Sequence, residues 1–104
     1  MTLNIYYNKR LPSFIIKRRT KKFLKGSQYF CRGNVFSYKE ASVSFYINKY
    51  YVFISVSNNT ESSASLINDY IFEIFKSNKI GIHFSDSNIK KYINVKNYVL
   101  LENI

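Results

Sequence analysis

The clearest hydrophobic pattern in the chain is a pair of alternating segments near its centre. Residues 42–47 (SVSFYI) and 50–56 (YYVFISV) carry an apolar side chain at every second position. Such alternation is typical of β-strands with one buried face. A two-residue turn at Asn48-Lys49 would join them, since Asn tolerates the positive φ that the turn requires. The predicted hairpin then places six side chains on one face, in the pairs Ile47 with Tyr50, Phe45 with Val52, and Val43 with Ile54.

The second face of this predicted hairpin is also aromatic. It carries Tyr46, Tyr51 and Phe53 among serines. If this face is exposed, its rings resemble a platform on which nucleic-acid bases stack. If another segment covers it, the same rings are packing residues. The pattern alone leaves both interpretations open.

A helical pattern follows the hairpin. Ser57-Asn58-Asn59-Thr60 is predicted to cap a helix of about 17 residues. Its core-facing stripe has the spacing i, i+3, i+4, i+7, i+8 and consists of Ile67, Tyr70, Ile71, Ile74 and Phe75. We then expect a strand at residues 80–84, a short helical turn capped by Asp86-Ser87, and a last strand at 98–101.

The first third of the chain has a weaker pattern. Residues 3–7 are compatible with a short strand. Residues 13–25 form either a helix, with Ser13 as N-cap and Gly26 as its stop, or an extended arm that orders on binding. In the helical alternative one face is shared by Ile16, Thr20, Phe23 and Leu24. Arg32-Gly33-Asn34 indicates a turn.

These elements predict an α+β fold: a small sheet built on the β-hairpin, packed against one main helix, with a basic N-terminal extension. We place the extension at residues 1–39 and the compact domain at residues 40–104.

Charge is what separates these two parts. The chain has a net charge of +10. Residues 1–39 contain no Asp or Glu, whereas the six basic and six acidic residues of 40–104 balance each other. Concentrated like charge destabilises a compact state, so it indicates a polyanionic partner. The predicted RNA-binding residues are Lys9, Arg10, Lys17, Arg18, Arg19, Lys21, Lys22, Lys25, Arg32 and Lys39.

Residues suited to catalysis or metal binding are few. His83 is the only histidine and Cys31 the only cysteine, and we interpret them as a surface or satisfied histidine and a small, at least half-buried hydrophobe. Asp69 and Glu73 are one helical turn apart on what we expect to be a solvated face. Three scattered glycines do not form a phosphate-binding loop. We predict no enzymatic activity, no cofactor, no metal and no small-molecule substrate.

Two further features bear on location. The longest apolar run, residues 50–54, is far shorter than the ~18 residues of a membrane span. Charged residues and Pro12 interrupt any secretory signal, and a single cysteine favours a reducing compartment.

The composition adds a resemblance. Lys, Asn, Ile, Tyr and Phe supply 56 of the 104 residues, a bias typical of AT-rich genomes such as those of organelles, viruses or reduced parasites. A basic, acid-free extension joined to a neutral α+β domain resembles the ribosomal proteins, particularly organelle-encoded mitochondrial ones. Residues 51–79 are similar to the start of a small-subunit ribosomal protein family with a ferredoxin-like fold. The resemblance implies a structural constituent of the mitochondrial ribosome that contacts ribosomal RNA and neighbouring ribosomal proteins.

Two alternatives stay open. The first is a viral or phage regulator or inhibitor that binds nucleic acid in the host cytoplasm. The second is a soluble accessory subunit of an organellar membrane complex.

Overall fold

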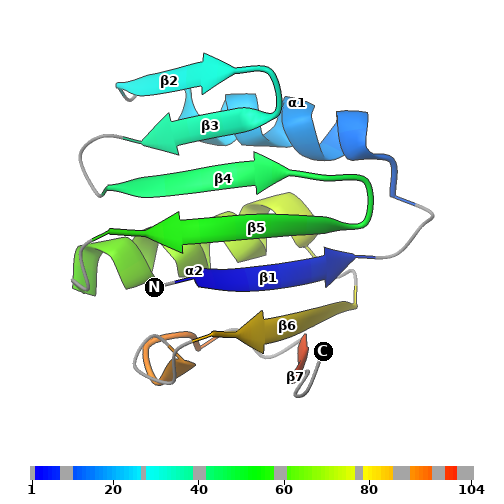
Figure 1. Ribbon diagram of the computed structural model, residues 1–104, viewed down its shortest axis with the longest axis vertical. Helices are drawn as coiled ribbons and strands as arrows, with labels where there is room; N and C mark the ends of the chain where they lie inside the picture. The colour runs from blue at the N-terminus through cyan, green and yellow to red at the C-terminus, as the bar shows by residue number, and fades with distance from the viewer. Residues whose placement is uncertain are drawn as a thin grey trace.

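Seven β-strands form one sheet across the residues that the computed structural model describes, and two helices pack against it (Figure 1). The described residues are 2–7, 11–26, 28–38, 42–57, 61–76, 79–85, 90–94 and 98–100. The strands are β1 (Thr2–Tyr7), β2 (Tyr29–Arg32), β3 (Val35–Tyr38), β4 (Val43–Ile47), β5 (Tyr51–Val56), β6 (Ile80–Phe84) and β7 (Tyr98–Leu100). The helices are α1 (Ser13–Leu24) and α2 (Glu61–Phe75). The fold is therefore α+β, as predicted, with a larger sheet than the hairpin alone implied.

The first strand of the chain lies inside the sheet. The strand order is β2-β3-β4-β5-β1-β6-β7, and all neighbouring pairs are antiparallel except β6 and β7, which are parallel. Ile5 of β1 lies opposite Val52 of β5 on one side and Ile82 of β6 on the other. The polar groups of two neighbouring strands thus depend on β1 for their hydrogen bonds.

The predicted division into an extension at 1–39 and a domain at 40–104 is wrong for the described residues. β1 joins the sheet between β5 and β6, and β3 pairs with β4, the first strand of the predicted hairpin. Residues 13–24 are a helix that packs on α2 and β4, which excludes the extended arm. The helix forms because Ile16, Thr20 and Leu24, spaced four residues apart, are buried on one face.

Both helices lie on the same side of the sheet, behind the strands in the view of Figure 1. The core fills the space between the two layers. On the sheet side it is formed by alternate residues, such as Leu3 and Ile5 of β1 and Val52 and Ile54 of β5. On the helix side it includes the whole predicted stripe of α2, whose five members are buried: Ile67, Tyr70, Ile71, Ile74 and Phe75.

Tyr70 is the largest of the fully buried side chains. Its ring stacks on Phe45 of β4 with centroids 4.2 Å apart, and it forms a T-shaped pair with Phe23 of α1, with centroids 5.5 Å apart. Its hydroxyl shares a 2.9 Å hydrogen bond with the hydroxyl of Thr20, which donates in turn to the carbonyl of Ile16 at 2.8 Å. The buried polar groups are therefore paired, which avoids the free-energy cost of an unsatisfied hydroxyl.

The β4–β5 hairpin forms, but its turn lies one residue later than predicted. Ile47 pairs with Val52, and the Asn48 amide donates to the Tyr51 carbonyl at 2.9 Å. Lys49 and Tyr50 are thus the central residues of the turn. The amide of Tyr7 donates to the Tyr50 carbonyl at 3.0 Å, and the Tyr7 hydroxyl donates to the carbonyl of Asn48. Contacts from β1 hold the turn in this position, which the hairpin sequence alone does not indicate.

Because the register moves by a two-residue step, the two faces keep their identities. Val43, Phe45, Ile47, Val52 and Ile54 are buried as predicted. The sixth buried residue of this face is Val56, which pairs with Val43, and not Tyr50, which is 43% exposed.

The ends of the helices differ in part from expectation. Pro12, not Ser13, is the N-cap of α1, and no side chain caps this end. Gly26 and Gly33 adopt φ values of +87° and +60°, in agreement with the predicted stop and turn. Lys76 follows α2 with a φ of 50°. The caps predicted at Asn58-Asn59-Thr60 and Asp86-Ser87 lie outside the described residues.

Candidate nucleic-acid interface

The basic side chains of α1 and of Lys25, the residue that follows it, form two rows on the surface. Lys17, Lys21 and Lys25 succeed one another at intervals of four residues, and Arg18 and Lys22 form a second row beside them. Four of these five are exposed, and Lys17 is half-buried. The rows exist because the helix turns its Ile16, Thr20 and Leu24 face to the core, which directs the intervening residues outwards.

Like charges four residues apart repel each other and weaken an isolated helix by a few tenths of a kcal/mol per pair. The three lysines are therefore no advantage to the stability of α1. Lys21 and Lys22 do lie in its last turn, where the helix dipole favours cations. A row of this kind is suited to phosphate groups, which neutralise it when they bind.

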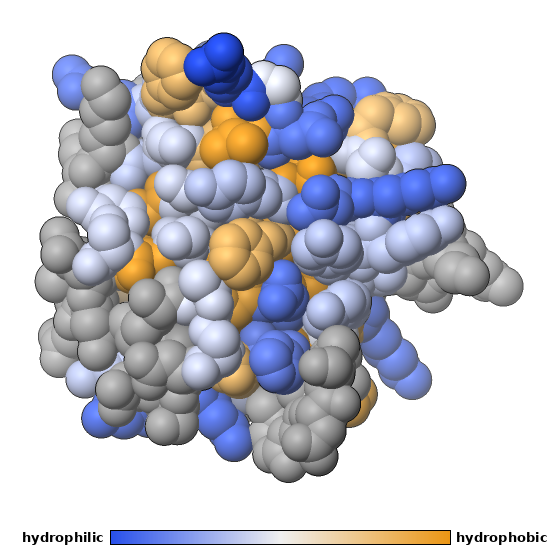
Figure 2. All heavy atoms as spheres, viewed as in Figure 1, coloured by the Kyte–Doolittle hydropathy of each residue, from blue (hydrophilic) through white to orange (hydrophobic). Residues whose placement is uncertain are grey.

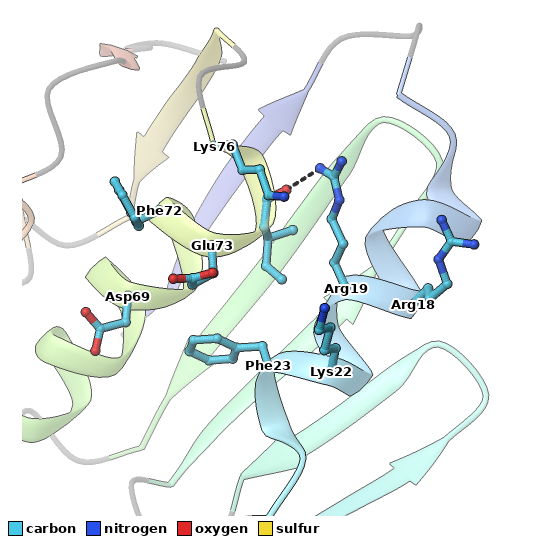
Figure 3. Close-up of a pocket in the computed structure, with 9 residues that line it drawn as sticks. Arg18, Arg19, Lys22, Phe23, Asp69, Phe72, Glu73 and Lys76 are labelled. Carbon is cyan, nitrogen blue, oxygen red and sulfur yellow. Dashed lines mark hydrogen bonds between the residues drawn. The ribbon is translucent and has the colours of Figure 1, made fainter.

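Arg19 has a structural partner, unlike its exposed neighbour Arg18. The Arg19 Nη1 donates to the main-chain carbonyl oxygen of Ile74 at 2.7 Å, and the side chain is half-buried (Figure 3). Ile74 is in the last turn of α2, whose carbonyl groups have no partner within the helix. Arg19 thus connects the two helices, and it is less suited to RNA than the sequence predicts.

The remaining predicted binding residues are dispersed. Arg32 is exposed at the end of β2, which forms one edge of the sheet. Lys9, Arg10 and Lys39 lie outside the described residues.

A groove separates the two helices beside the rows of α1 (Figure 3). Arg18, Lys22 and Phe23 line it from α1, and Asp69, Phe72 and Glu73 line it from α2. Asp69 and Glu73 are exposed, in agreement with the predicted solvated face, and Phe72 is 69% exposed. Within the described part of the chain, no three His, Cys, Asp or Glu side chains are grouped as metal ligands would be.

A second surface lies on the opposite side of the sheet. The helices leave this face of the strands uncovered, and Figure 2 shows it from the same direction as Figure 1. Orange hydrophobic side chains lie at its centre among pale ones, and long blue hydrophilic side chains project from its rim. Tyr46 and Tyr51 are 37% and 36% exposed, and Phe53 is half-buried. No described segment covers these rings, so they do not serve as packing residues beneath another element of the described chain.

The rings border a hollow in this face, and sequence reasoning did not identify three of the residues that line it. Tyr6, Asn4 and Asn48 line it together with Tyr46, Tyr51 and Phe53. The alternation of residues 3–7 already separates Asn4 and Tyr6 from Leu3 and Ile5. The missing information was that β1 is the neighbour of β5, which places Tyr6 opposite Tyr51.

Cys31 and His83 are far apart. Cys31 is on β2 and His83 on β6, with four strands between them, so at ~4.8 Å per strand they are separated by roughly 24 Å. They cannot form a nucleophile–base pair. Cys31 is a free, exposed thiol, contrary to the buried or half-buried position expected for it. His83 is half-buried on the uncovered face, opposite Asn4.

No protein-family model, no curated protein and no solved structure matches this chain. Neither α1 nor α2, the helices of the described part of the chain, is long and apolar enough to cross a membrane.

Proposed function

We propose that this protein is an RNA-binding structural component of a ribonucleoprotein, and that α1 holds the RNA by its phosphate groups. The observation that supports this most is the exposed cationic surface of α1, defined by Arg18, Lys21, Lys22 and Lys25. It belongs to a segment of 39 residues without a single acid, in a chain whose remainder is neutral. The packing of the helix does not require these four side chains.

A charge-neutralising variant tests the proposal. The substitutions Lys21→Gln, Lys22→Gln and Lys25→Gln remove three exposed charges and retain residues with good helix propensity. We expect unchanged thermal stability and weaker binding to RNA. The slope of log K against log salt should fall by about 2 for single-stranded RNA, because each lost phosphate contact contributes about 0.7.

The matched control removes the same number of charges elsewhere. Lys79, Lys90 and Lys91 are also exposed lysines, and none of them belongs to α1. Their joint replacement by Gln should leave the salt slope nearly unchanged. Equal losses of RNA affinity in the two variants would show that binding depends on net charge and not on α1. If the affinity of the wild type for RNA does not depend on salt, the proposal is overturned.

The ribonucleoprotein that we propose is the organellar, mitochondrial ribosome, because of the compositional bias and the acid-free first third. Sedimentation of the tagged protein in a cell extract tests this part separately. We expect it to co-sediment with ribosomal RNA at low salt and to be released as salt rises. If the purified protein binds RNA but does not co-sediment with ribosomal RNA, the alternative of a viral or phage regulator that binds nucleic acid is favoured.

A further inference from the structure

We propose that the uncovered face of the sheet is a stacking platform for the unpaired bases of single-stranded RNA, with Tyr46, Tyr51 and Phe53 at its centre. This inference rests on the proposed RNA-binding function and names a second contact surface and the form of RNA that it takes. We call this surface the sheet platform.

The register of the sheet aligns the platform across six strands. Residues directly opposite each other in neighbouring strands share a face. The successive pairs Arg32–Val35, Val35–Tyr46, Tyr46–Phe53, Phe53–Asn4 and Asn4–His83 therefore form one continuous row. A guanidinium is at one end of this row, two rings are at its centre, and an amide and an imidazole are at the other end.

Next to this row, Tyr51 and Tyr6 form an adjacent pair on the same face. Their ring centroids are 5.6 Å apart, and those of Tyr46 and Phe53 are 5.5 Å apart. In both pairs the rings are tilted, at 36° and 57°. These rings are partly exposed at Tyr46 and Tyr51 and half-buried at Tyr6 and Phe53, and they offer bases several π-faces. Asn4 and Asn48 beside them supply hydrogen-bonding groups.

The charge distribution around the platform suits a polyanionic partner such as RNA. Three of its four rings are tyrosines, which tolerate water when unoccupied, and the face also carries serines such as Ser37 and Ser44, whose hydroxyls are 3.3 Å apart. The acidic residues that the structure describes all belong to α2, and α2 lies on the other side of the sheet (Figure 1). The platform therefore has no described carboxylate to repel phosphate.

The edge strand β2 connects the platform with the cationic surface of α1. α1 leads directly into β2 through Gly26, and β2 carries Arg32 at its end. Phe30, 56% exposed, lies opposite Ser37 on the platform side of this strand. An RNA strand held by α1 could thus continue around this edge onto the platform, where its bases meet the rings.

The experiment compares single-stranded and duplex RNA. The variant Tyr46→Leu with Tyr51→Leu keeps apolar bulk and removes two rings. We expect it to bind an oligouridylate at least about tenfold more weakly, since stacking contributes about 1–3 kcal/mol per base. Its affinity for an RNA duplex of equal length, and its salt slope, should not change, because bases in a duplex cannot stack on the rings and no phosphate contact is lost.

Two controls accompany this variant. Tyr46→Phe with Tyr51→Phe retains the rings and should bind like the wild type, which separates stacking from general damage to the fold. Tyr92→Leu removes a ring of similar exposure, 38%, that belongs to neither of the two proposed contact surfaces, and it should have no effect. Circular dichroism and urea unfolding are measured on every variant.

The outcomes distinguish this inference from the proposed function. If the wild type binds neither RNA, the proposed function fails and the inference with it. If the Leu variant binds oligouridylate like the wild type while the Lys21, Lys22 and Lys25 variant does not, the platform is overturned and the proposed function stands. If the Leu variant keeps its RNA affinity but no longer co-sediments with the ribonucleoprotein, the platform contacts a protein, which also overturns the inference.

Discussion

Arg18 and Arg19 are neighbours in the sequence with different environments. Arg18 is exposed beside the groove between the helices, whereas the Arg19 guanidinium donates to the carbonyl of Ile74 at 2.7 Å. A hydrogen bond from a charged donor to an otherwise unpaired helix carbonyl contributes more than a neutral one. The two arginines therefore have separable roles in stability and in binding.

We predict that Arg19→Gln lowers the free energy of unfolding by about 1–2 kcal/mol. Arg18→Gln should leave unfolding unchanged and weaken RNA binding. Urea denaturation and RNA titration of both variants test this. Equal stability of the two variants would contradict the structural role of Arg19.

The same contact changes the expectation for neutralising the whole basic segment. Replacing all six cations of residues 17–25 by Ser would remove this bond together with the surface charges. Arg19 belongs to that set, so such a variant would also be destabilised. The exposed lysines alone give the cleaner test of binding.

At the scale of the elements, β1 is the strand on which most depends. It is the partner of both β5 and β6, and its amide and hydroxyl at Tyr7 also hold the β4–β5 turn. Without it, β5 and β6 each lose one of their two neighbouring strands, and Leu3 and Ile5 leave cavities in the core.

We predict that a fragment of residues 40–104 does not fold on its own. It lacks three of the seven strands and one of the two helices. Far-UV circular dichroism and amide dispersion in NMR spectra should indicate an unfolded or aggregated chain. A cooperative unfolding transition of this fragment would restore the division at residue 39.

A pair of substitutions in the full chain tests the same point. Ile5→Asp places a charge in the core and should unfold the protein, whereas Asn4→Asp, on the other face of the same strand, should be tolerated.

At the scale of the whole molecule, stability should decline in alkaline solution. Burial raises the pKa of Tyr7 from 10.0 to about 12. Burial also raises the pKa of Tyr70 well above its usual range. Both hydroxyls are held within the fold, by Asn48 and by Thr20.

The sign follows from proton binding in the two states. An unfolded chain releases these phenolic protons near pH 10, while the folded protein retains them. The stability that they contribute is complete below pH 10 and is lost as pH rises towards about 12 and beyond. Urea unfolding at a series of pH values should show this decline, and Tyr7→Phe should make it shallower. An equal slope in wild type and variant would refute the role of Tyr7.

The whole molecule also has two dissimilar sides. The helical side carries the cationic surface and all described acidic residues, and the sheet side carries the cluster of rings formed by Tyr6, Tyr46, Tyr51 and Phe53. This arrangement underlies the proposed division of labour, with phosphate bound on one side and bases on the other.

Most elements could be predicted from local periodicity. The stripe of α2, the Ile16, Thr20 and Leu24 positions of α1, and five of the six predicted core positions of β4 and β5 are buried, whereas Tyr50 is exposed. They are predictable because a helix and a strand repeat at 3.6 and 2 residues, so each segment carries its own buried face in the sequence. The charge partition is likewise a property of the sequence alone.

Only the tertiary structure determined the contacts between segments that are distant in the sequence. Three examples are the position of β1 beside β5, the contact of β1 with the β4–β5 turn, and the bond from Arg19 to Ile74. The residues that they join are 41 to 55 positions apart in the sequence. Periodicity tells which side of an element is buried but not which element covers it or lies beside it. For that reason the sequence could not decide whether Tyr46, Tyr51 and Phe53 are packed or exposed. The tertiary structure places both helices on the other face of the sheet, so no described segment covers these three rings.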